Sequence, residues 1–168
     1  MSLKLDALHK VFIEQLKDMY SSERQLLDAI PQMAGAATSE KLTQAFNDHL
    51  KETQTHVDRI ETIFESTEFR PGGHRCKAMA GLVEEAKEII NEDGEPEAKD
   101  AALICAAQKI EHYEMATYGS LRAYARVLGH DKAYELLTKT LEEERTADSS
   151  LTDLAENTIN KLAMLAAT

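Results

Sequence analysis

The segment ICAAQKIEHYEMATYGSLRAYA, residues 104–125, decides the fold that we predict for this chain. Its apolar positions recur at steps of three and four residues, which is the period of one face of an α-helix. Glu111 and Glu114 interrupt that face at two positions where hydrophobic side chains are expected. An unpaired buried carboxylate costs several kcal/mol, and the whole stability of a domain is only about 5–15 kcal/mol. The segment therefore predicts a buried helix whose carboxylates are neutralised by cations.

The same helical period recurs in three other long segments and in one short segment. The long segments cover about residues 5–30, 42–64, 96–129 and 131–162, and the short one about 77–91. The stretch TSEK (38–41) contains capping residues for the second long helix, and Gly129 ends the third. Pro31 and Gly35 are expected to loosen the end of the first helix, and Asp131 to cap the fourth.

Short connections near residues 31–39 and 129–130 make each pair of long helices antiparallel. The only long connection joins the two pairs and contains the short helix. This order predicts an all-α, ferritin-like four-helix bundle with one long crossover containing a short extra helix. The length of 168 residues suits one domain covering residues 1–168.

Composition excludes several classes of function. The net charge of −11 opposes binding to nucleic acid and to anionic membrane surfaces. No run of about 20 apolar residues is present, so no membrane span is expected. The amphipathic start lacks the apolar stretch of an export signal, and the isolated Cys76 and Cys105 suit a reducing compartment. We therefore expect a cytoplasmic protein.

Acidic residues also interrupt the apolar faces of the other long helices. Glu23 lies within the first face, and Glu144 and Asp148 lie within the fourth. Glu52 lies nearer the edge of the second face. Glu114 and Glu144 are each fifteen residues from Gly129, so the antiparallel pairing brings them to one level. Glu23 and Glu52 are related in the same way across the first connection. The pairing predicts that these carboxylates converge on one site.

Other polar residues lie close to the predicted carboxylate cluster. His56, one turn after Glu52, is the candidate imidazole, and His49, one turn before it, is the alternative. Glu143 replaces Glu144 if the helical phase is shifted by one residue. Tyr20 and Tyr118 lie one turn from Glu23 and Glu114, where each hydroxyl is able to donate to a carboxylate.

Oxygen ligands with one or two imidazoles suit iron or manganese. The predicted cofactor is accordingly a pair of iron ions, with manganese as the alternative. The predicted metal ligands are Glu23, Glu52, His56, Glu111, Glu114, Glu144 and Asp148.

Nearly the entire chain resembles the YciE/YciF group of bacterial, stress-associated ferritin-like proteins, which are related to rubrerythrins. The resemblance is carried by YSSERQL (20–26), HLKET (49–53), IEHYE (110–114) and LEEER (141–145). It implies that Glu23 and Glu111 are terminal ligands, that Glu52 and Glu144 bridge two metal ions, and that Glu114 is an additional ligand. It also implies a homodimer.

The chain departs from the di-iron pattern of that resemblance at the histidine positions. Thr55 and Ala147 stand three residues after Glu52 and Glu144, where related di-iron proteins carry histidine. Three functions follow as alternatives. The first is redox chemistry with oxygen or peroxide, of the ferroxidase, peroxidase or catalase type. The second is metal binding without turnover, and the third is a helical interaction module that binds no metal.

Overall fold

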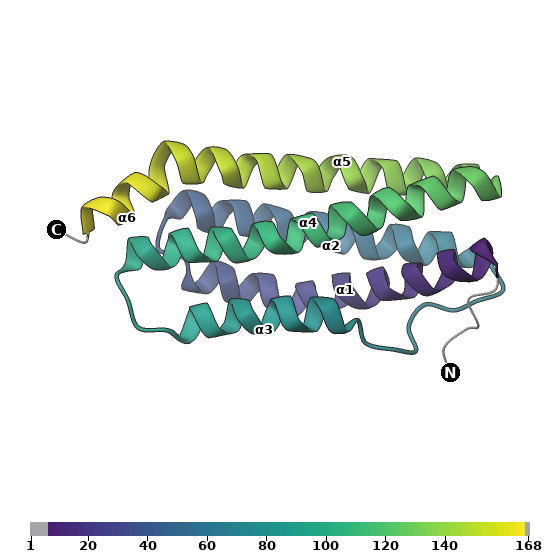
Figure 1. Ribbon diagram of the computed structural model, residues 1–168, viewed down its shortest axis with the longest axis horizontal. Helices are drawn as coiled ribbons and strands as arrows, with labels where there is room; N and C mark the ends of the chain where they lie inside the picture. Colours follow the sequence, from purple (N-terminus) through teal and green to yellow (C-terminus); the bar gives the residue numbers. More distant parts are fainter. Residues whose placement is uncertain (1–6, 167–168) are drawn as a thin grey trace.

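The computed structural model describes residues 7–166, and within that range it contains helices and connections but no strand (Figure 1). The elements are α1 (Leu8–Ala36), α2 (Glu40–Glu65), α3 (Lys77–Asn91), α4 (Pro96–Leu128), α5 (Asp131–Leu154), a π-helical turn (Ala155–Ile159) and α6 (Asn160–Ala166). Residues 1–6 and 167–168 of the predicted domain lie outside the described part of the chain.

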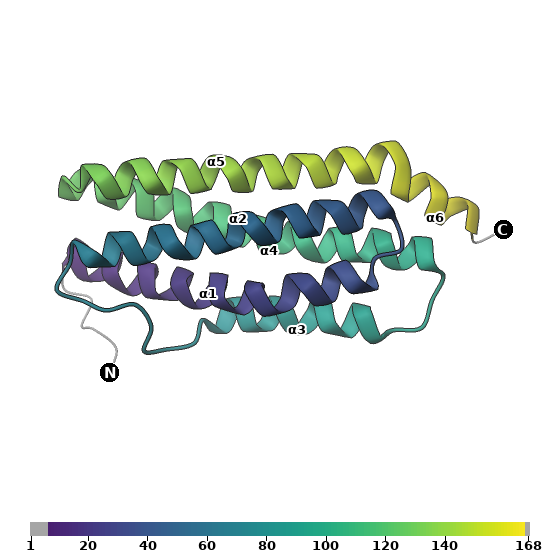
Figure 2. The ribbon, with the colours of Figure 1, turned by 180° about the vertical axis from the view of Figure 1, so that it is seen from behind.

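The four long helices lie side by side as two antiparallel hairpins, α1 with α2 and α4 with α5 (Figures 1 and 2). The crossover from α2 to α4 contains α3, which packs along α1 and α4. The predicted all-α bundle, with one long crossover containing a short helix, is confirmed. α6 continues beyond α5 at one end of the bundle and packs on α4.

Most helix ends follow the signals in the sequence. The Ser39 hydroxyl accepts a hydrogen bond from the Leu42 amide at 3.5 Å, and Gly129 ends α4 with a φ of 73°. Two expectations need correction. Pro31 lies inside α1, which continues to Ala36 because the apolar face beyond Pro31 stays buried. His130, not Asp131, is the N-cap of α5; Asp131 lies in the first turn, where a negative charge favours the helix dipole.

Asp100 on α4 fastens the connection between α1 and α2. Its carboxylate accepts hydrogen bonds from the Thr38 amide at 2.8 Å, the Thr38 hydroxyl at 2.7 Å and the Ser39 amide at 2.8 Å. Charged acceptors make the stronger hydrogen bonds of proteins. This residue therefore fixes the turn of one hairpin to the first helix of the other.

Two apolar clusters fill the bundle, one toward each end. The first includes Leu26, Met33 and Ile104. The second includes Leu16 and Leu137. The helical stretches between the two clusters carry the polar residues described below, so the core is divided by a polar layer about halfway along the helices. None of the helices formed by residues 7–166 has the length and apolarity needed to cross a membrane.

Candidate metal centre

Four carboxylates meet in the polar layer between the two apolar clusters. Glu23 comes from α1, Glu111 and Glu114 come from α4, and Glu144 comes from α5. Each of these residues is at most 3% exposed to solvent. Glutamate is rarely buried to this extent unless it is paired. The helical period placed these four side chains correctly inside the bundle.

Helix α2 contributes two imidazoles to the same layer. Nδ1 of His56 lies 3.0 Å from a carboxylate oxygen of Glu144 and 3.4 Å from one of Glu23. Nε2 of His49 lies 3.2 Å from an oxygen of Glu111 and 3.8 Å from the other oxygen of Glu144. Both histidines therefore face the cluster, whereas the sequence offered His49 only as the alternative to His56.

The donor atoms form two groups that share one residue. His49, Glu111, Glu114 and Glu144 each place one donor atom within 4.8 Å of the others. Glu23, His56 and Glu144 form a second group by the same measure. Glu144 belongs to both groups and lies between the two imidazoles. Glu144 is therefore the residue that would contact both ions if each group held one.

Many of these buried atoms have no hydrogen-bond partner. Both oxygens of Glu114 and both of Glu144 are without one, and so is one oxygen each of Glu23 and Glu111. Nδ1 of His56 and Nε2 of His49 are also unpartnered. A buried polar atom left without a partner costs about 1–3 kcal/mol. So many atoms facing one point indicate a ligand that accepts their lone pairs, and a metal ion fits that requirement.

The protonation equilibria of the metal-free cluster are strongly shifted. Burial raises the pKa of both Glu111 and Glu114 well above the ordinary value. The negative charge of a neighbouring carboxylate raises each pKa further: Glu144 acts mainly on Glu111, and Glu23 acts mainly on Glu114. Burial by itself lowers the pKa of His56, but its contacts with Glu144 and Glu23 outweigh burial and raise the pKa to about 11. Protons thus supply the positive charge that the cluster requires when metal is absent.

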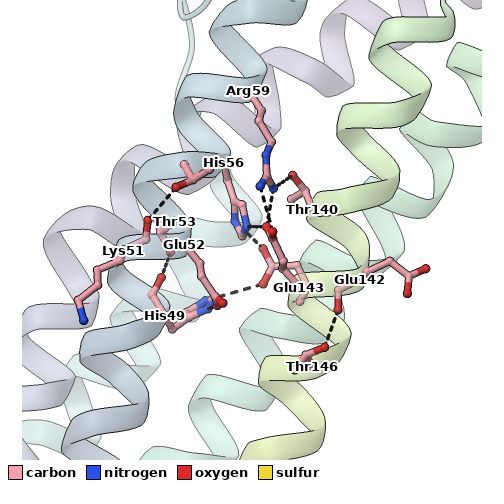
Figure 3. Close-up of polar contacts among 12 residues, drawn as sticks. His49, Lys51, Glu52, Thr53, His56, Arg59, Thr140, Glu142, Glu143 and Thr146 are labelled. Carbon is pink, nitrogen blue, oxygen red and sulfur yellow. Dashed lines mark hydrogen bonds and ion pairs between the residues drawn. The ribbon is translucent and has the colours of Figure 1, made fainter.

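The ring nitrogen of His56 that faces away from the cluster contacts an ion pair between α2 and α5. Nε2 of His56 lies 3.0 Å from a carboxylate oxygen of Glu143 on α5. The guanidinium of Arg59 on α2 donates to both oxygens of Glu143, one at 3.0 Å, and to the Thr140 hydroxyl at 3.0 Å. Figure 3 shows His56 and Arg59 pointing from α2 toward Glu143. This arrangement favours a proton on Nε2 and leaves the Nδ1 lone pair facing the cluster.

The two predicted tyrosine donors behave differently. Tyr118 is 1% exposed and its hydroxyl donates to a carboxylate oxygen of Glu23. The hydroxyl of Tyr20 instead donates to Glu61 at 2.8 Å on the surface. Only Tyr118 therefore has the carboxylate-orienting position that was expected of both.

Two predicted ligands, Glu52 and Asp148, stand outside both donor groups. The inner face of α2 runs through His49, Thr53 and His56, so Glu52 falls beside it with a side chain 46% exposed. A carboxylate oxygen of Glu52 lies 3.4 Å from Nδ1 of His49 (Figure 3). Asp148 accepts a hydrogen bond at 3.1 Å from the side chain of Gln108. Both carboxylates border the cluster and neither enters it.

Sequence reasoning missed Arg59 altogether and considered Glu143 only as a substitute for Glu144. Arg59 is 9% exposed, although arginine is mostly a surface residue. Its spacing of three residues from His56 was the signal available in the sequence. The partner on α5 follows only from the way the two helices pack.

Comparison with known proteins places the chain among relatives of similar length. Residues 7–164 match the family model described as a domain of unknown function, DUF892. Protein YciF of Escherichia coli strain K12 is 48% identical over 162 residues, which cover 96% of this chain and 98% of the relative.

Solved structures show the same architecture. The crystal structure of the Escherichia coli stress protein YciF has a TM-score of 0.90 and 48% identity, and the match covers 94% of this chain and 99% of that one. YcfI from Rhodopseudomonas palustris has a TM-score of 0.86 and 37% identity, covering 90% and 97% of the two chains. A protein from Xanthomonas campestris pv. campestris shares the fold at 16% identity, with a TM-score of 0.78 over 96% and 100% of the chains.

Proposed function

The chain belongs to the DUF892 family and to the YciE/YciF group, and from this premise we propose that it binds two divalent metal ions, iron in the first place, in the polar layer of the bundle. One ion would be held by His49, Glu111, Glu114 and Glu144, and the other by Glu23, His56 and Glu144, the two groups of donor atoms described above. The observation that carries this proposal is the set of buried, unpartnered oxygen and nitrogen atoms contributed by all four long helices.

Charge supports two divalent ions. The cluster contains four buried carboxylates, Glu23, Glu111, Glu114 and Glu144, whose negative charges two divalent ions balance. Glu52 and Asp148 stand outside, so the surplus of negative charge that six ligand carboxylates would create does not arise. Carboxylates with imidazoles and without thiolates suit iron or manganese. Bundle-core sites of this composition are typical of ferritin-like di-iron and di-manganese proteins.

The chemistry that we propose is oxidation or reduction with oxygen or peroxide as the small substrate. We propose that this chemistry forms part of a stress response, because the Escherichia coli relative is described as a stress protein. Bound iron or manganese supplies the change of oxidation state that such chemistry needs. The chain itself orients the donors: the Glu143–Arg59 pair fixes the His56 ring, and Tyr118 fixes Glu23. The apolar clusters on either side limit the access of water to the layer.

Metal content of protein purified without chelators tests the proposal directly. We expect two metal ions per chain in the parent and in Glu142→Gln, whose exposed side chain on α5 removes an equal charge outside the cluster. Glu144→Gln removes the shared donor and should retain at most one ion. A well-folded parent that holds no metal and whose stability iron or manganese does not change would overturn the proposal.

Turnover separates the redox function from metal binding alone. We expect the reduced, iron-loaded parent to consume oxygen or peroxide, followed with an oxygen electrode and by the change in its absorbance. A loaded protein that consumes neither would be a metal-binding protein without turnover.

A further inference from the structure

A cavity of about 220 Å³ leads from the surface between α2 and α5 to the candidate metal centre. Its inner wall includes His49 and Glu111, which are 9% and 3% exposed. Its outer wall includes Asp48, Glu52 and Ser150, which are exposed. The cavity thus joins solvent to one of the two donor groups.

The inner wall carries atoms that require a ligand. Nε2 of His49 and one carboxylate oxygen of Glu111 are buried without a hydrogen-bond partner. Both residues are at least nine-tenths buried. Carboxylate oxygen and imidazole nitrogen offer lone pairs, so the species that this wall attracts is a cation.

Glu52 connects the outer wall to the inner wall. Its carboxylate is about half exposed and lies 3.4 Å from Nδ1 of His49, the ring atom opposite the one that faces Glu111. The other acidic residue of the outer wall, Asp48, is already paired with Lys51 at 2.7 Å and Gln44 at 2.8 Å. Glu52 is therefore the carboxylate of this wall that stands next to the buried donors.

Another cavity, larger than this one, has a different lining. It measures about 510 Å³ and lies beside the start of α3, and its lining carries three positive side chains, Lys17, Arg75 and Lys77, against two acidic ones, Glu14 and Asp18. No residue of either donor group lines it. A cation approaching the metal centre would be attracted by Glu52, whereas the lining of the other cavity does not carry an excess of negative charge.

We infer that the cavity between α2 and α5 is the entry site for the divalent cation, and that Glu52 is a transfer carboxylate that passes the ion to His49 and Glu111. This inference rests on the proposed metal-binding function. It gives Glu52 a kinetic role in loading, in place of the role of a permanent bridging ligand.

Loading kinetics test the inference with matched variants. Chelator-treated protein, with its helix content checked by circular dichroism, is mixed with Co²⁺ without oxygen, and the absorbance of the bound ion is followed. Glu52→Gln is compared with Glu65→Gln, which removes the same charge from the far end of α2. Ser150→Phe, which narrows the cavity, is compared with Ser149→Phe, an exposed neighbour outside its lining.

We expect Glu52→Gln to load about tenfold more slowly, in line with the effect of electrostatic steering on association rates. Ser150→Phe should also load more slowly, because the cavity is narrower. The final number of ions should equal that of the parent, and both control variants should load at the parental rate. Unchanged rates in both test variants would overturn the entry role, and a reduced final number in Glu52→Gln would make Glu52 a resident ligand. A parent that takes up no Co²⁺ overturns the metal-binding proposal itself, and the entry site with it.

Discussion

One carboxylate oxygen of Glu144 lies 3.0 Å from Nδ1 of His56, yet neither atom has a hydrogen-bond partner in the structure. Two buried atoms with lone pairs remain this close only when a positive charge lies near them. In the metal-free protein that charge is a proton on His56, whose pKa is raised to about 11. The proposed ions would take over this role.

Glu114→Gln should stabilise the metal-free protein and reduce the stabilisation that metal adds. Glu114 is fully buried with both oxygens unpartnered, and burial raises its pKa well above the ordinary value. Glutamine keeps the shape of the side chain without a charge to desolvate. We expect a gain of about 1–3 kcal/mol in the free energy of unfolding, measured in urea without metal, and a smaller gain on adding Fe²⁺ than in Glu142→Gln. A variant less stable than the metal-free parent would contradict the burial argument.

The metal-free protein should lose stability as pH rises above 6.5. The pKa of His56 is raised from 6.5 to about 11, so its contribution is complete below pH 6.5 and declines as pH rises toward 11. The raised pKa values of Glu111 and Glu114 act in the same direction above their ordinary values. Each proton retained only by the folded state lowers stability by about 1.4 kcal/mol per pH unit.

Urea unfolding at pH 6.5, 7.5 and 8.5 checks this slope. His56→Gln should flatten it, whereas His112→Gln, at an exposed position on α4, should not. Metal should bind more tightly at the higher pH because it displaces these protons. Equal stability of the metal-free parent at all three pH values would refute the assignment.

Glu143→Gln should weaken metal binding without abolishing it. Glu143 accepts from Nε2 of His56 and is itself held by Arg59, so its removal frees the orientation of the imidazole. Partners of metal-binding histidines typically contribute about 10–100-fold to affinity. Competition with a coloured chelator measures the change, with Glu142→Gln as the control. An affinity equal to that of the control would mean that the Arg59–Glu143 pair only joins the helices.

Tyr118→Phe and Tyr20→Phe form a matched pair. The Tyr118 hydroxyl donates to the buried Glu23, whereas the Tyr20 hydroxyl donates to Glu61 on the surface. Loss of the first leaves a buried carboxylate oxygen without its donor and should cost about 1–3 kcal/mol of stability. Loss of the second should change stability by less than about 0.5 kcal/mol. Thermal unfolding of the two variants distinguishes these outcomes.

The sequence was sufficient for the architecture and for most of the buried carboxylates. Long runs at a period of 3.6 residues and two short connections determine an antiparallel bundle. Residues at the centre of a face, such as Glu23 and Glu144, are then placed with little ambiguity. Residues at the edge of a face are harder to place from the sequence. On α2 the buried face is shifted by one residue from the expected one, so Thr53 is buried and Glu52 lies beside the face.

The contacts between helices could not be obtained in this way. His49 faces Glu111, and Arg59 reaches Glu143, because of the rotation and the separation of α2 and α5. Asp148 shares the helical face of Glu144, but the amide of Gln108 on α4 holds it outside the cluster. Periodicity describes each helix separately, and these pairings belong to the packed bundle.

The division of the apolar core by a polar layer has a consequence for how the molecule opens. Each apolar cluster is able to remain packed while the layer between them is weakened by buried polar atoms without hydrogen-bond partners. Amide hydrogens near Glu114 and Glu144 should therefore exchange sooner than those near Leu16 or Met33. Ions in the layer would couple the two ends into one cooperative unit. The resistance of the protein to proteolysis would then increase with the concentration of available metal.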